Sequence, residues 1–222
     1  MFGHFGMFRN LLFPIIFACE RMRLYNPAMR DFEIIRRRLD DRLLPPDKVS
    51  IEIERIPQAA VTVILHEESG IARLMIIKRA DREGDPWSGH LALPGGRAHP
   101  EDSDLIATAA RETWEEVGMN LFDGGQFIGR LPVLNPSTPR LPPIEILPLV
   151  AIAPPEFSLI LNHEVASAFW MRVDFLKQQG LSSHHSMNFG PFSKKWPAYP
   201  SDEGPIWGIT ERILSNFLSL ID

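Results

Sequence analysis

The sequence predicts a single α/β (α+β) domain, a sandwich in which helices pack against a mixed sheet. Short runs rich in β-branched residues alternate with a few segments of helical periodicity, which is typical of this class. The chain has 222 residues and is 45% hydrophobic, enough to bury one sizeable core. Its 20 prolines cluster between the periodic segments, where they indicate loops.

Three segments have apolar residues three and four positions apart, the spacing of a helix with one buried face. The expected helices lie at residues 31–44, 103–117 and 206–220. Pro45 and Pro46 stop the first helix, Asp102 or Ser103 can cap the second, and Gly118 ends it. The expected buried stripes are Ile106, Ala109, Thr113 and Val117 in the second helix and Ile209, Ile213, Phe217 and Leu220 in the third.

Strands are expected where apolar runs are short and bounded by glycine, proline or polar residues. These runs lie at residues 59–65, 72–79, 90–93, 126–131, 144–152 and 167–173. The connection at residues 131–143 is too rich in proline for a helix or a central strand, so we expect an exposed loop there. His184 and His185 fall in a polar segment that we also expect to be an exposed loop.

The first 28 residues form an extension to the expected domain at residues 29–222. Their apolar run, Leu11–Cys19, is too short to span a bilayer, which needs about 20 residues. Charged residues follow it, where the cleavage site of a signal peptide would need small side chains. We expect translation to begin at Met22 or Met29, and an interfacial anchor and a packed N-terminal element are the alternatives.

The charge and the cysteine content exclude some classes of function. A net charge of −5 at pH 7 argues against a broad nucleic-acid-binding surface, which usually has a basic balance. It is compatible with a small phosphorylated ligand held by a few arginines and metal ions. Cys19 is the single cysteine, so an internal disulfide cannot form and a reducing, cytoplasmic setting fits. No membrane partner is expected, and a homodimer is left open beside a monomer.

The stretch from Pro94 to Met119 contains the residues that predict chemistry. Glu112, Glu115 and Glu116 stand at positions i, i+3 and i+4 of the expected helix, so their carboxylates share one face. Like charges at this spacing repel each other, and we expect a divalent cation to compensate them. Carboxylate oxygens are the ligands that Mg²⁺ and Mn²⁺ prefer, so the three glutamates predict a site for one of these ions. The alternative is an acidic helix face solvated by water.

Residues beside the three glutamates fit a site for a metal and a phosphate. Arg111 stands one residue before Glu112 and four before Glu115, where it can orient a carboxylate by a charge-assisted hydrogen bond. Gly95 and Gly96 let the backbone approach a metal or phosphate without a Cβ atom in the way. The N-terminus of the helix adds a favourable field for anions.

Three further arginines are candidates for binding the substrate. Arg79 ends an expected strand and Arg97 follows the glycines, and each can bind a phosphate through two parallel hydrogen bonds. A surface salt bridge is the alternative for both. Arg140 is the only charged residue of the loop at 131–143, and it either meets a phosphate or is exposed to solvent.

The segment resembles the Nudix box, in outline G-x5-E-x7-R-E-U-x-E-E-x-G-U, in which U is a bulky apolar residue. The matching positions are Arg111, Glu112, Glu115, Glu116, Gly118 and Met119, and Thr113 stands at a U position. One departure is that 14 residues separate Gly96 from Arg111, one more than the outline allows. The isolated glutamate of the outline falls on Ser103, with Asp102 beside it.

The resemblance to Nudix hydrolases implies a fold and a role for these residues. The fold is the Nudix α/β/α sandwich, in which this stretch is a catalytic loop–helix–loop. The three glutamates and the carbonyl of Gly96 hold Mg²⁺ or Mn²⁺, and a metal-bound water attacks the diphosphate of a small nucleotide substrate. Glu112 is the expected residue to orient or deprotonate that water, with Glu164 as the second candidate. Glu164 is otherwise a surface glutamate at the start of a strand.

A finer resemblance is to the coenzyme A pyrophosphatase-like branch of the family. It rests on the aspartate at position 102, the longer spacing and the stretch WSGHLALPGG at residues 87–96. His90 and Leu93 stand where that branch usually has glutamine and phenylalanine. The branch implies hydrolysis of coenzyme A to 3′,5′-ADP and 4′-phosphopantetheine. The alternatives are ADP-ribose, NADH or a nucleoside triphosphate as substrate, or a catalytically silent Nudix fold that senses a ligand.

Overall fold

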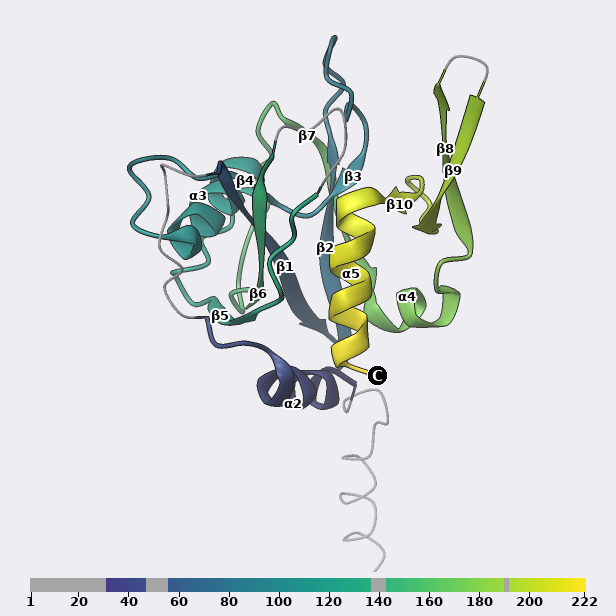
Figure 1. Cartoon of the computed structure of the whole chain (residues 1–222). Coiled ribbons are helices and arrows are strands. Elements are labelled where there is room, and N and C mark those ends of the chain that lie inside the picture. Colours follow the sequence, from purple (N-terminus) through teal and green to yellow (C-terminus); the bar gives the residue numbers. More distant parts are fainter. Residues whose placement is uncertain (1–30, 47–55, 137–142, 190–191) are drawn as a thin grey trace, which may run out of the picture.

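The computed structural model describes residues 31–46, 56–136, 143–189 and 192–222, and Figure 1 shows their arrangement. The strands of the main sheet are β1 (Gln58–Glu68), β2 (Ile71–Arg79), β3 (Leu91–Ala92), β4 (Gly95–Arg97), β5 (Gln126–Arg130), β6 (Glu145–Ile152) and β7 (Val165–Arg172). Their order is β3-β2-β1-β6-β5, with β4 paired to β1 and β7 paired to β2. β1 and β6 are parallel, whereas the other pairs are antiparallel. The sheet is therefore mixed, as predicted.

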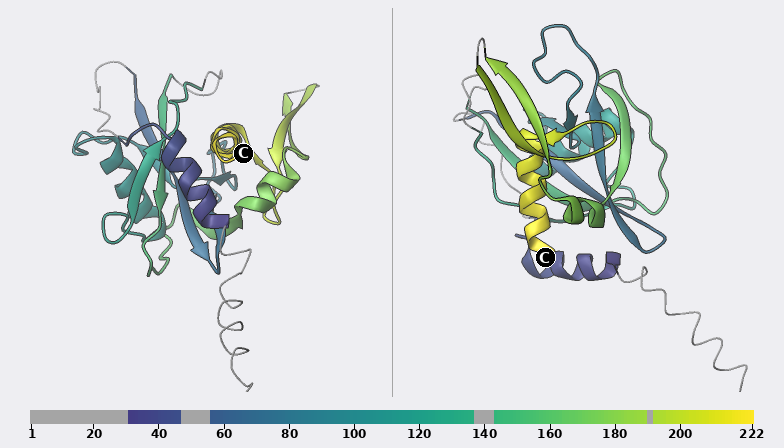
Figure 2. Two further views of the ribbon diagram at one scale, coloured as in Figure 1. Left: turned by 90° about the horizontal axis from the view of Figure 1, so that it is seen from below. Right: turned by 90° about the vertical axis from the view of Figure 1, so that its right-hand side faces the viewer.

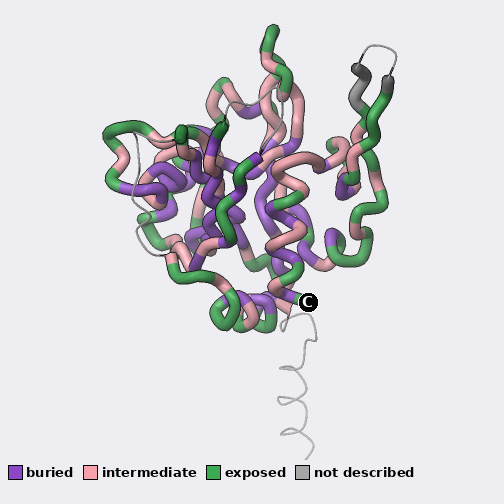
Figure 3. Tube along the Cα trace, in the orientation of Figure 1, coloured by how far each residue is buried: buried purple, intermediate pink, exposed green. Residues whose placement is uncertain are grey.

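Helices cover both faces of this sheet. α3 (Leu105–Val117) lies on one side, and α2 (Asp31–Arg42) and α5 (Gly208–Leu220) lie on the other (Figures 1 and 2). The core on the side of α2 and α5 includes Leu39 and Phe217, both fully buried. On the side of α3, Val117 packs with Ile64 of β1. The buried residues follow these two interfaces (Figure 3), and the predicted sandwich is confirmed.

A second, smaller sheet was not predicted. It consists of β8 (Ser183–Phe189), β9 (Phe192–Tyr199) and β10 (Ile206–Trp207), and it follows a short helix, α4 (Val173–Gln179). β8 and β9 form a hairpin that stands beside α4 and α5 (Figure 1). The expectation of a loop at His184 and His185 is wrong, because both residues pair with β9. His184 is exposed as expected, whereas His185 is partly buried. Pro197 is tolerated in β9 because it lies just outside the two residues that pair with β10.

Most element boundaries agree with the prediction, with corrections around the glutamate-bearing helix. α3 begins at Leu105, and Asp104 caps it by accepting the N–H of Ala107 at 2.8 Å. The predicted cap at Asp102 or Ser103 is therefore wrong, whereas Gly118 ends the helix as expected, with φ +72°. The buried face of α3 is Leu105, Thr108, Ala109, Ala110, Thr113, Glu116 and Val117, and Ile106 is only partly buried.

The other differences are smaller. The first helix ends at Arg42, and the last begins at Gly208. The strand expected at 90–93 shortens to β3, and Gly95 and Gly96, for which no strand was expected, form β4 with Arg97. None of the helices that the structure describes is long and apolar enough to cross a membrane. The extension at residues 1–28 and Arg140 lie outside the described residues.

Candidate functional site

α3 places its glutamates against the two glycines of β4. Gly95 and Gly96 pair with Val61 and Ala60 of β1. Gly95 has φ +148°, and a Cβ atom there would lie 2.3 Å from the carbonyl oxygen of Ala60. A Cβ atom on Gly96 would lie 2.5 Å from the carboxyl carbon of Glu112. Gly95 therefore requires glycine, whereas a side chain at position 96 would displace the Glu112 carboxylate, against which the backbone of Gly96 lies.

Glu116 is the most buried of the three glutamates. It is 3% exposed, and its Oε2 accepts the N–H of Gly95 at 2.9 Å. Burial raises the pKa of Glu116 to about 8, although the Gly95 hydrogen bond acts in the opposite direction. Burial also raises the pKa of the partly buried Glu112, against the effect of Arg111. A buried carboxylate with so little positive charge around it is a favourable place for a cation.

Arg111 organises the more exposed side of the site. Its Nη1 donates to Glu112 and to Glu115, each at 2.9 Å. Its Nε and Nη2 donate to the two carboxylate oxygens of Asp102 at 2.9 and 3.1 Å. Nη2 also donates to the carbonyl of Arg97 at 3.0 Å. Arg111 therefore holds two glutamates of α3 and the loop that precedes the helix at the same time.

Asp102 is the anchor of this arginine. Besides Arg111, it accepts the N–H of His99 at 2.9 Å and the hydroxyl of Thr108 at 2.8 Å. Burial acts to raise the pKa of Asp102, but the hydrogen bonds from Arg111, His99 and Thr108 outweigh it and hold the pKa at about 2. Asp102 is thus a charged anchor at neutral pH rather than the helix cap that the sequence indicated.

The donor set fits a divalent ion in its chemistry. As the side chains stand, no three carboxylate or histidine groups of the described residues converge on one point. Glu116 is nevertheless buried, with no ion pair to a cationic side chain among the described residues, and Gly96 has no Cβ atom to crowd Glu112. Glu115, whose side chain is 49% exposed, reaches Arg111 through an i,i+4 ion pair. Such pairs contribute about 0.3–0.5 kcal/mol, so Glu115 can turn from Arg111 to a metal at little cost.

Glu164 lies just before β7, next to the loop at residues 80–89. Its carbonyl oxygen accepts the N–H of Ala80 at 2.8 Å, which fixes the backbone of Glu164 against the start of that loop. Its carboxylate accepts a hydrogen bond from Nη2 of Arg82 at 2.9 Å. The charge of Glu164 is among the causes that raise the pKa of Glu116, so Glu164 acts electrostatically on the same site.

The candidate phosphate-binding arginines differ in their surroundings. Arg79 ends β2 and donates from Nη2 to Asp85 at 2.9 Å, while its buried Nε has no partner among the described residues. Its charge also acts to lower the pKa of Glu116. The side chain of Arg97 is exposed. The charges of Arg79 and Glu164 thus both act on Glu116, and the structure gives no position for Arg140.

Sequence reasoning missed Arg82 and Asp85 as members of this site. Asp85 accepts the N–H of Trp87 at 2.9 Å in addition to Arg79, and these hydrogen bonds lower the pKa of Asp85. The sequence signal was the alternation of charges at residues 81–85, in a loop that leads directly to the glycines. A solvated loop has the same pattern, so the sequence did not single out either residue.

An aromatic cluster connects this loop to the smaller sheet. The rings of His185 and Trp207 are stacked with centroids 4.0 Å apart, and His90 meets them edge-on at 5.5 and 5.1 Å. Burial lowers the pKa of His90, as does the neighbouring His185, and burial also lowers the pKa of His185. The carbonyl of His90 accepts the N–H of Arg79 at 3.0 Å. The hairpin therefore contacts the segment that carries Arg79.

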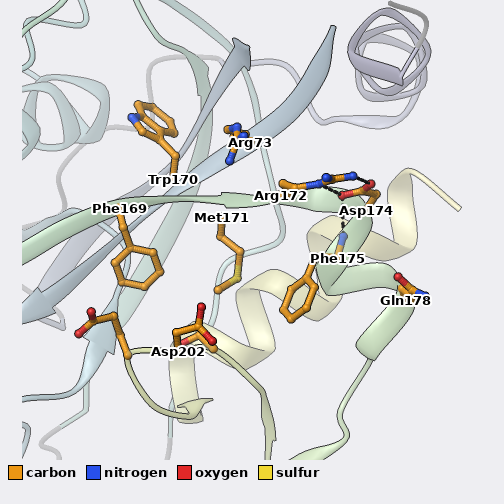
Figure 4. A pocket seen from close by; sticks show the side chains of 11 residues that line it. Arg73, Phe169, Trp170, Met171, Arg172, Asp174, Phe175, Gln178 and Asp202 are labelled. Carbon is orange, nitrogen blue, oxygen red and sulfur yellow. Dashed lines mark hydrogen bonds and ion pairs between the residues drawn. The ribbon is translucent and has the colours of Figure 1, made fainter. Parts of the chain in front are cut away.

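A pocket of about 550 Å³ lies elsewhere, at the far end of β7 (Figure 4). Its wall includes Phe169 and Met171 of β7, Phe175 of α4 and Asp202 of the turn before β10. Of the charged groups that line it, Arg172 and Asp174 form an ion pair with each other, whereas Arg73 pairs with Glu68 and Glu203 with Lys78, which lie outside the lining. None of the glutamates of α3 lines it, so this pocket is separate from the candidate site.

Comparison with known protein families identifies the family of this domain. The model of the NUDIX domain matches residues 56–187, more than half of the chain. The matched segment contains the glycines of β4, all of α3 and Glu164. The chain therefore belongs to the Nudix family. Members of this family act on small nucleotide substrates and generally use divalent metal ions.

Two relatives and one solved structure illustrate the similarity. A Schizosaccharomyces pombe protein of uncharacterised function is 39% identical over 106 residues, which cover 46% of this chain and 32% of that protein. This chain thus spans about a third of the length of that relative. The mitochondrial coenzyme A diphosphatase NUDT8 of Homo sapiens is 28% identical over 170 residues, which cover 75% of this chain and 70% of that protein.

The solved structure is that of a MutT/nudix family protein from Enterococcus faecalis. It has a TM-score of 0.53 and 20% sequence identity, over 78% of this chain and 64% of that one. This similarity concerns the fold, and it confirms the Nudix sandwich with its mixed sheet.

Proposed function

We propose that this protein hydrolyses a diphosphate bond in a nucleotide-containing substrate with the help of a divalent metal ion. The observation that carries the proposal is the buried Glu116 beside the partly buried Glu112, both against the glycine backbone of β4. A buried acid whose pKa is about 8 is costly to keep unless a cation binds there. Family membership supplies the class of reaction.

We propose Mg²⁺, with Mn²⁺ as a substitute, held by Glu112, Glu115, Glu116 and the carbonyl of Gly96. When bound, the ion would neutralise the diphosphate and lower the pKa of a water molecule. Glu112 is the candidate to orient that water and accept its proton, because burial raises its pKa above the ordinary value of a glutamate. Glu164 is the second candidate, since it acts on the same site from the start of β7.

Arg111 and Arg79 would have different tasks in this reaction. Arg111 is held by Asp102 and positions Glu112 and Glu115, so it acts through these carboxylates. Arg79 has a buried Nε without a partner among the described residues, so it has a donor to offer to a phosphate oxygen. The binding of Arg97 and Arg140 to substrate remains a hypothesis.

The substrate that we propose is coenzyme A or a derivative. Two observations support it: the longer spacing between Gly96 and Arg111, and the similarity to a protein named as a coenzyme A diphosphatase, at 28% identity. Hydrolysis would give 3′,5′-ADP and 4′-phosphopantetheine. A reducing compartment such as the cytoplasm is proposed on the single cysteine.

A catalytically silent ligand sensor is the second candidate function. A sensor that does not need a metal would be more stable with an apolar residue in place of the buried Glu116, because an unpaired buried carboxylate is destabilising. The retention of Glu116 together with Glu112 and Glu115 therefore favours the enzyme.

The test is a screen of the purified protein with Mg²⁺ against coenzyme A, ADP-ribose, NADH and dinucleoside polyphosphates. We expect coenzyme A to be hydrolysed with the highest kcat/KM, and chelation of the metal to abolish the activity. Preference for another substrate would contradict the assignment of coenzyme A alone. Binding of these ligands without any turnover would favour the silent sensor.

A further inference from the structure

Three arginines interact with carboxylates of the candidate site: Arg111 with glutamates of α3, Arg79 electrostatically with Glu116, and Arg82 with Glu164. One of them is held far more weakly than the others. Arg111 is tied to two glutamates, to Asp102 and to a backbone carbonyl. Arg79 is bound to Asp85, whose side chain is only 16% exposed and which the loop backbone also holds. Arg82 instead contacts Glu164 through Nη2, with side chains 43% and 39% exposed.

This difference decides which arginine can change partner. An exposed ion pair contributes about 0–1 kcal/mol, because water solvates both partners and ordering two side chains costs entropy. The pair of Arg82 and Glu164 is of this kind. A diphosphate carries more negative charge than a carboxylate, and its oxygens match the two parallel donors of a guanidinium. Arg82 would therefore gain by exchanging Glu164 for a phosphate.

The backbone keeps Arg82 beside the site in either state. The N–H of Ala80 donates to the carbonyl of Glu164 at 2.8 Å, only two residues before Arg82. The N–H of Arg82 itself donates to the hydroxyl of Ser88 at 2.7 Å, which closes the loop on itself. The side chain can thus move while the loop remains attached to the start of β7.

We propose that Arg82 binds the diphosphate of the substrate and, in doing so, releases the Glu164 carboxylate that it holds in the ligand-free protein. Glu164, once released, is free to turn toward the metal and the attacking water. This inference rests on the proposed function, since it assigns a further substrate-binding residue to the same site. It adds a contact that neither the box motif nor Arg79 provides.

The test measures binding of magnesium imidodiphosphate, a diphosphate that is not hydrolysed, by titration calorimetry. Arg82→Ala is expected to raise Kd about 10-fold or more, which corresponds to the loss of one charge-assisted contact. Arg82→Lys keeps the charge but lacks the two parallel donors of a guanidinium. Its Kd should therefore lie between that of the original protein and that of Arg82→Ala. Arg212→Ala, which removes an exposed arginine of α5, is the matched control and should bind like the original protein.

The same calorimetric measurement on Glu164→Gln distinguishes two roles of Arg82: direct binding of the phosphate, and positioning of Glu164. If Arg82 contacts the phosphate, Arg82→Ala in the Glu164→Gln background should weaken binding at least as much as it does alone, since no ion pair has to break. If Arg82 acts only by holding Glu164, the effect should vanish in that background. Urea unfolding of each variant checks that the fold is unchanged.

The outcomes distinguish this inference from the proposed function. The protein could bind imidodiphosphate in a manner that depends on Arg82 and yet hydrolyse none of the nucleotides. This result would support the inference and overturn the proposed hydrolytic function. The protein could instead hydrolyse a nucleotide, while Arg82→Ala changes its Kd for imidodiphosphate by less than about twofold. This result would overturn the inference about Arg82 and leave the proposed function standing. Failure of the unmodified protein to bind magnesium imidodiphosphate would overturn it as well.

Discussion

Arg111 binds both carboxylate oxygens of Asp102, nine positions earlier in the chain, through Nε at 2.9 Å and Nη2 at 3.1 Å. The side chain of Asp102 is 6% exposed and that of Arg111 is 22% exposed, so water reaches this pair mainly from the side of Arg111. Because the same guanidinium also reaches Glu112 and Glu115, the loop before α3 determines where two of the three glutamates lie. The extra residue between Gly96 and Arg111 belongs to this loop.

The first prediction concerns the stability of this anchor in acid. The pKa of Asp102 is about 2 in the folded chain, below its ordinary value of 3.8, so ionised Asp102 stabilises the fold above pH 4. This stabilisation, about 2 kcal/mol, should be lost as the pH falls from about 4 to about 2. Asp102→Asn should lower the free energy of unfolding at pH 7 and flatten its decline in acid, measured by urea unfolding between pH 2 and 7.

Asp104→Asn is the control for Asp102→Asn. Asparagine caps a helix about as well as aspartate, so the hydrogen bond to the N–H of Ala107 can be kept. We expect a change below about 1 kcal/mol, from the lost charge at the helix N-terminus. Equal acid profiles for Asp102→Asn and the original protein would contradict the role given to Asp102.

The second prediction concerns the glutamates of α3. Glu115→Gln or Glu116→Gln removes a charged metal ligand with little change of shape, so hydrolysis should slow at least about 100-fold, about 2.7 kcal/mol of transition-state stabilisation. The fold should survive, because the repulsion between carboxylates falls and the amide oxygen introduced by Glu116→Gln can still accept the N–H of Gly95. Initial rates with Mg²⁺, with binding of Mn²⁺ measured separately, check this prediction.

Glu101→Gln, in the exposed loop before α3, is the matched control and should leave the rate unchanged. Rates within a few-fold of the original protein for both glutamate variants of α3 would show that these residues do not hold the metal. A loss of rate without any loss of Mn²⁺ affinity would assign them another task.

The sequence predicts those elements of the fold whose side chains show a recognisable pattern of apolar and polar residues. β1 and β2 were predicted because each has an unbroken run of buried, mainly apolar residues that includes β-branched side chains. β4 was not, because Gly95 and Gly96 have no side chains and their pairing with β1 is a property of the backbone. β8 and β9 were missed because His184, Ser186 and Lys194 are polar and exposed, so their alternation resembles a loop.

The candidate site shows the same limit. Glu112, Glu115 and Glu116 follow from helical periodicity, but periodicity did not show that Glu116 is buried and hydrogen-bonded to Gly95. Asp102, Ser103 and Asp104 are all good capping residues, and the side-chain contact of Asp102 with Arg111 leaves the cap to Asp104. Such choices depend on tertiary contacts that one sequence does not reveal.

The third prediction concerns substrate choice and Arg140, which lies outside the described residues. The loop that carries Arg140 follows β5, and loops of this kind set specificity because their sequences vary freely. If Arg140 binds the 3′-phosphate of coenzyme A, Arg140→Ala should raise KM for coenzyme A by roughly 10- to 150-fold, the value of one charge-assisted contact. KM for dephospho-coenzyme A, which lacks that phosphate, is the control and should change little. Equal changes for both substrates, or none for either, would exclude this role.

The last prediction concerns the N-terminal segment and the helix that follows it. α2 buries Phe32, Ile35 and Leu39 in the core, and Arg42 donates to the carbonyl of Leu220 at 2.8 Å. A chain that starts at Met29 keeps all of these contacts, so we expect it to have the activity and the urea midpoint of the full chain.

A chain that starts at Pro45 is the contrasting deletion. It lacks three buried apolar side chains, each of which contributes about 1.5–3 kcal/mol. The sum is comparable with the whole free energy of unfolding of a small domain, about 5–15 kcal/mol, so this shorter chain should be largely unfolded or aggregated. Circular dichroism and urea titration of the two deletions, with initial rates for the longer one, check both expectations. Aggregation or inactivity of the chain that starts at Met29 would show instead that residues 1–28 pack against the domain.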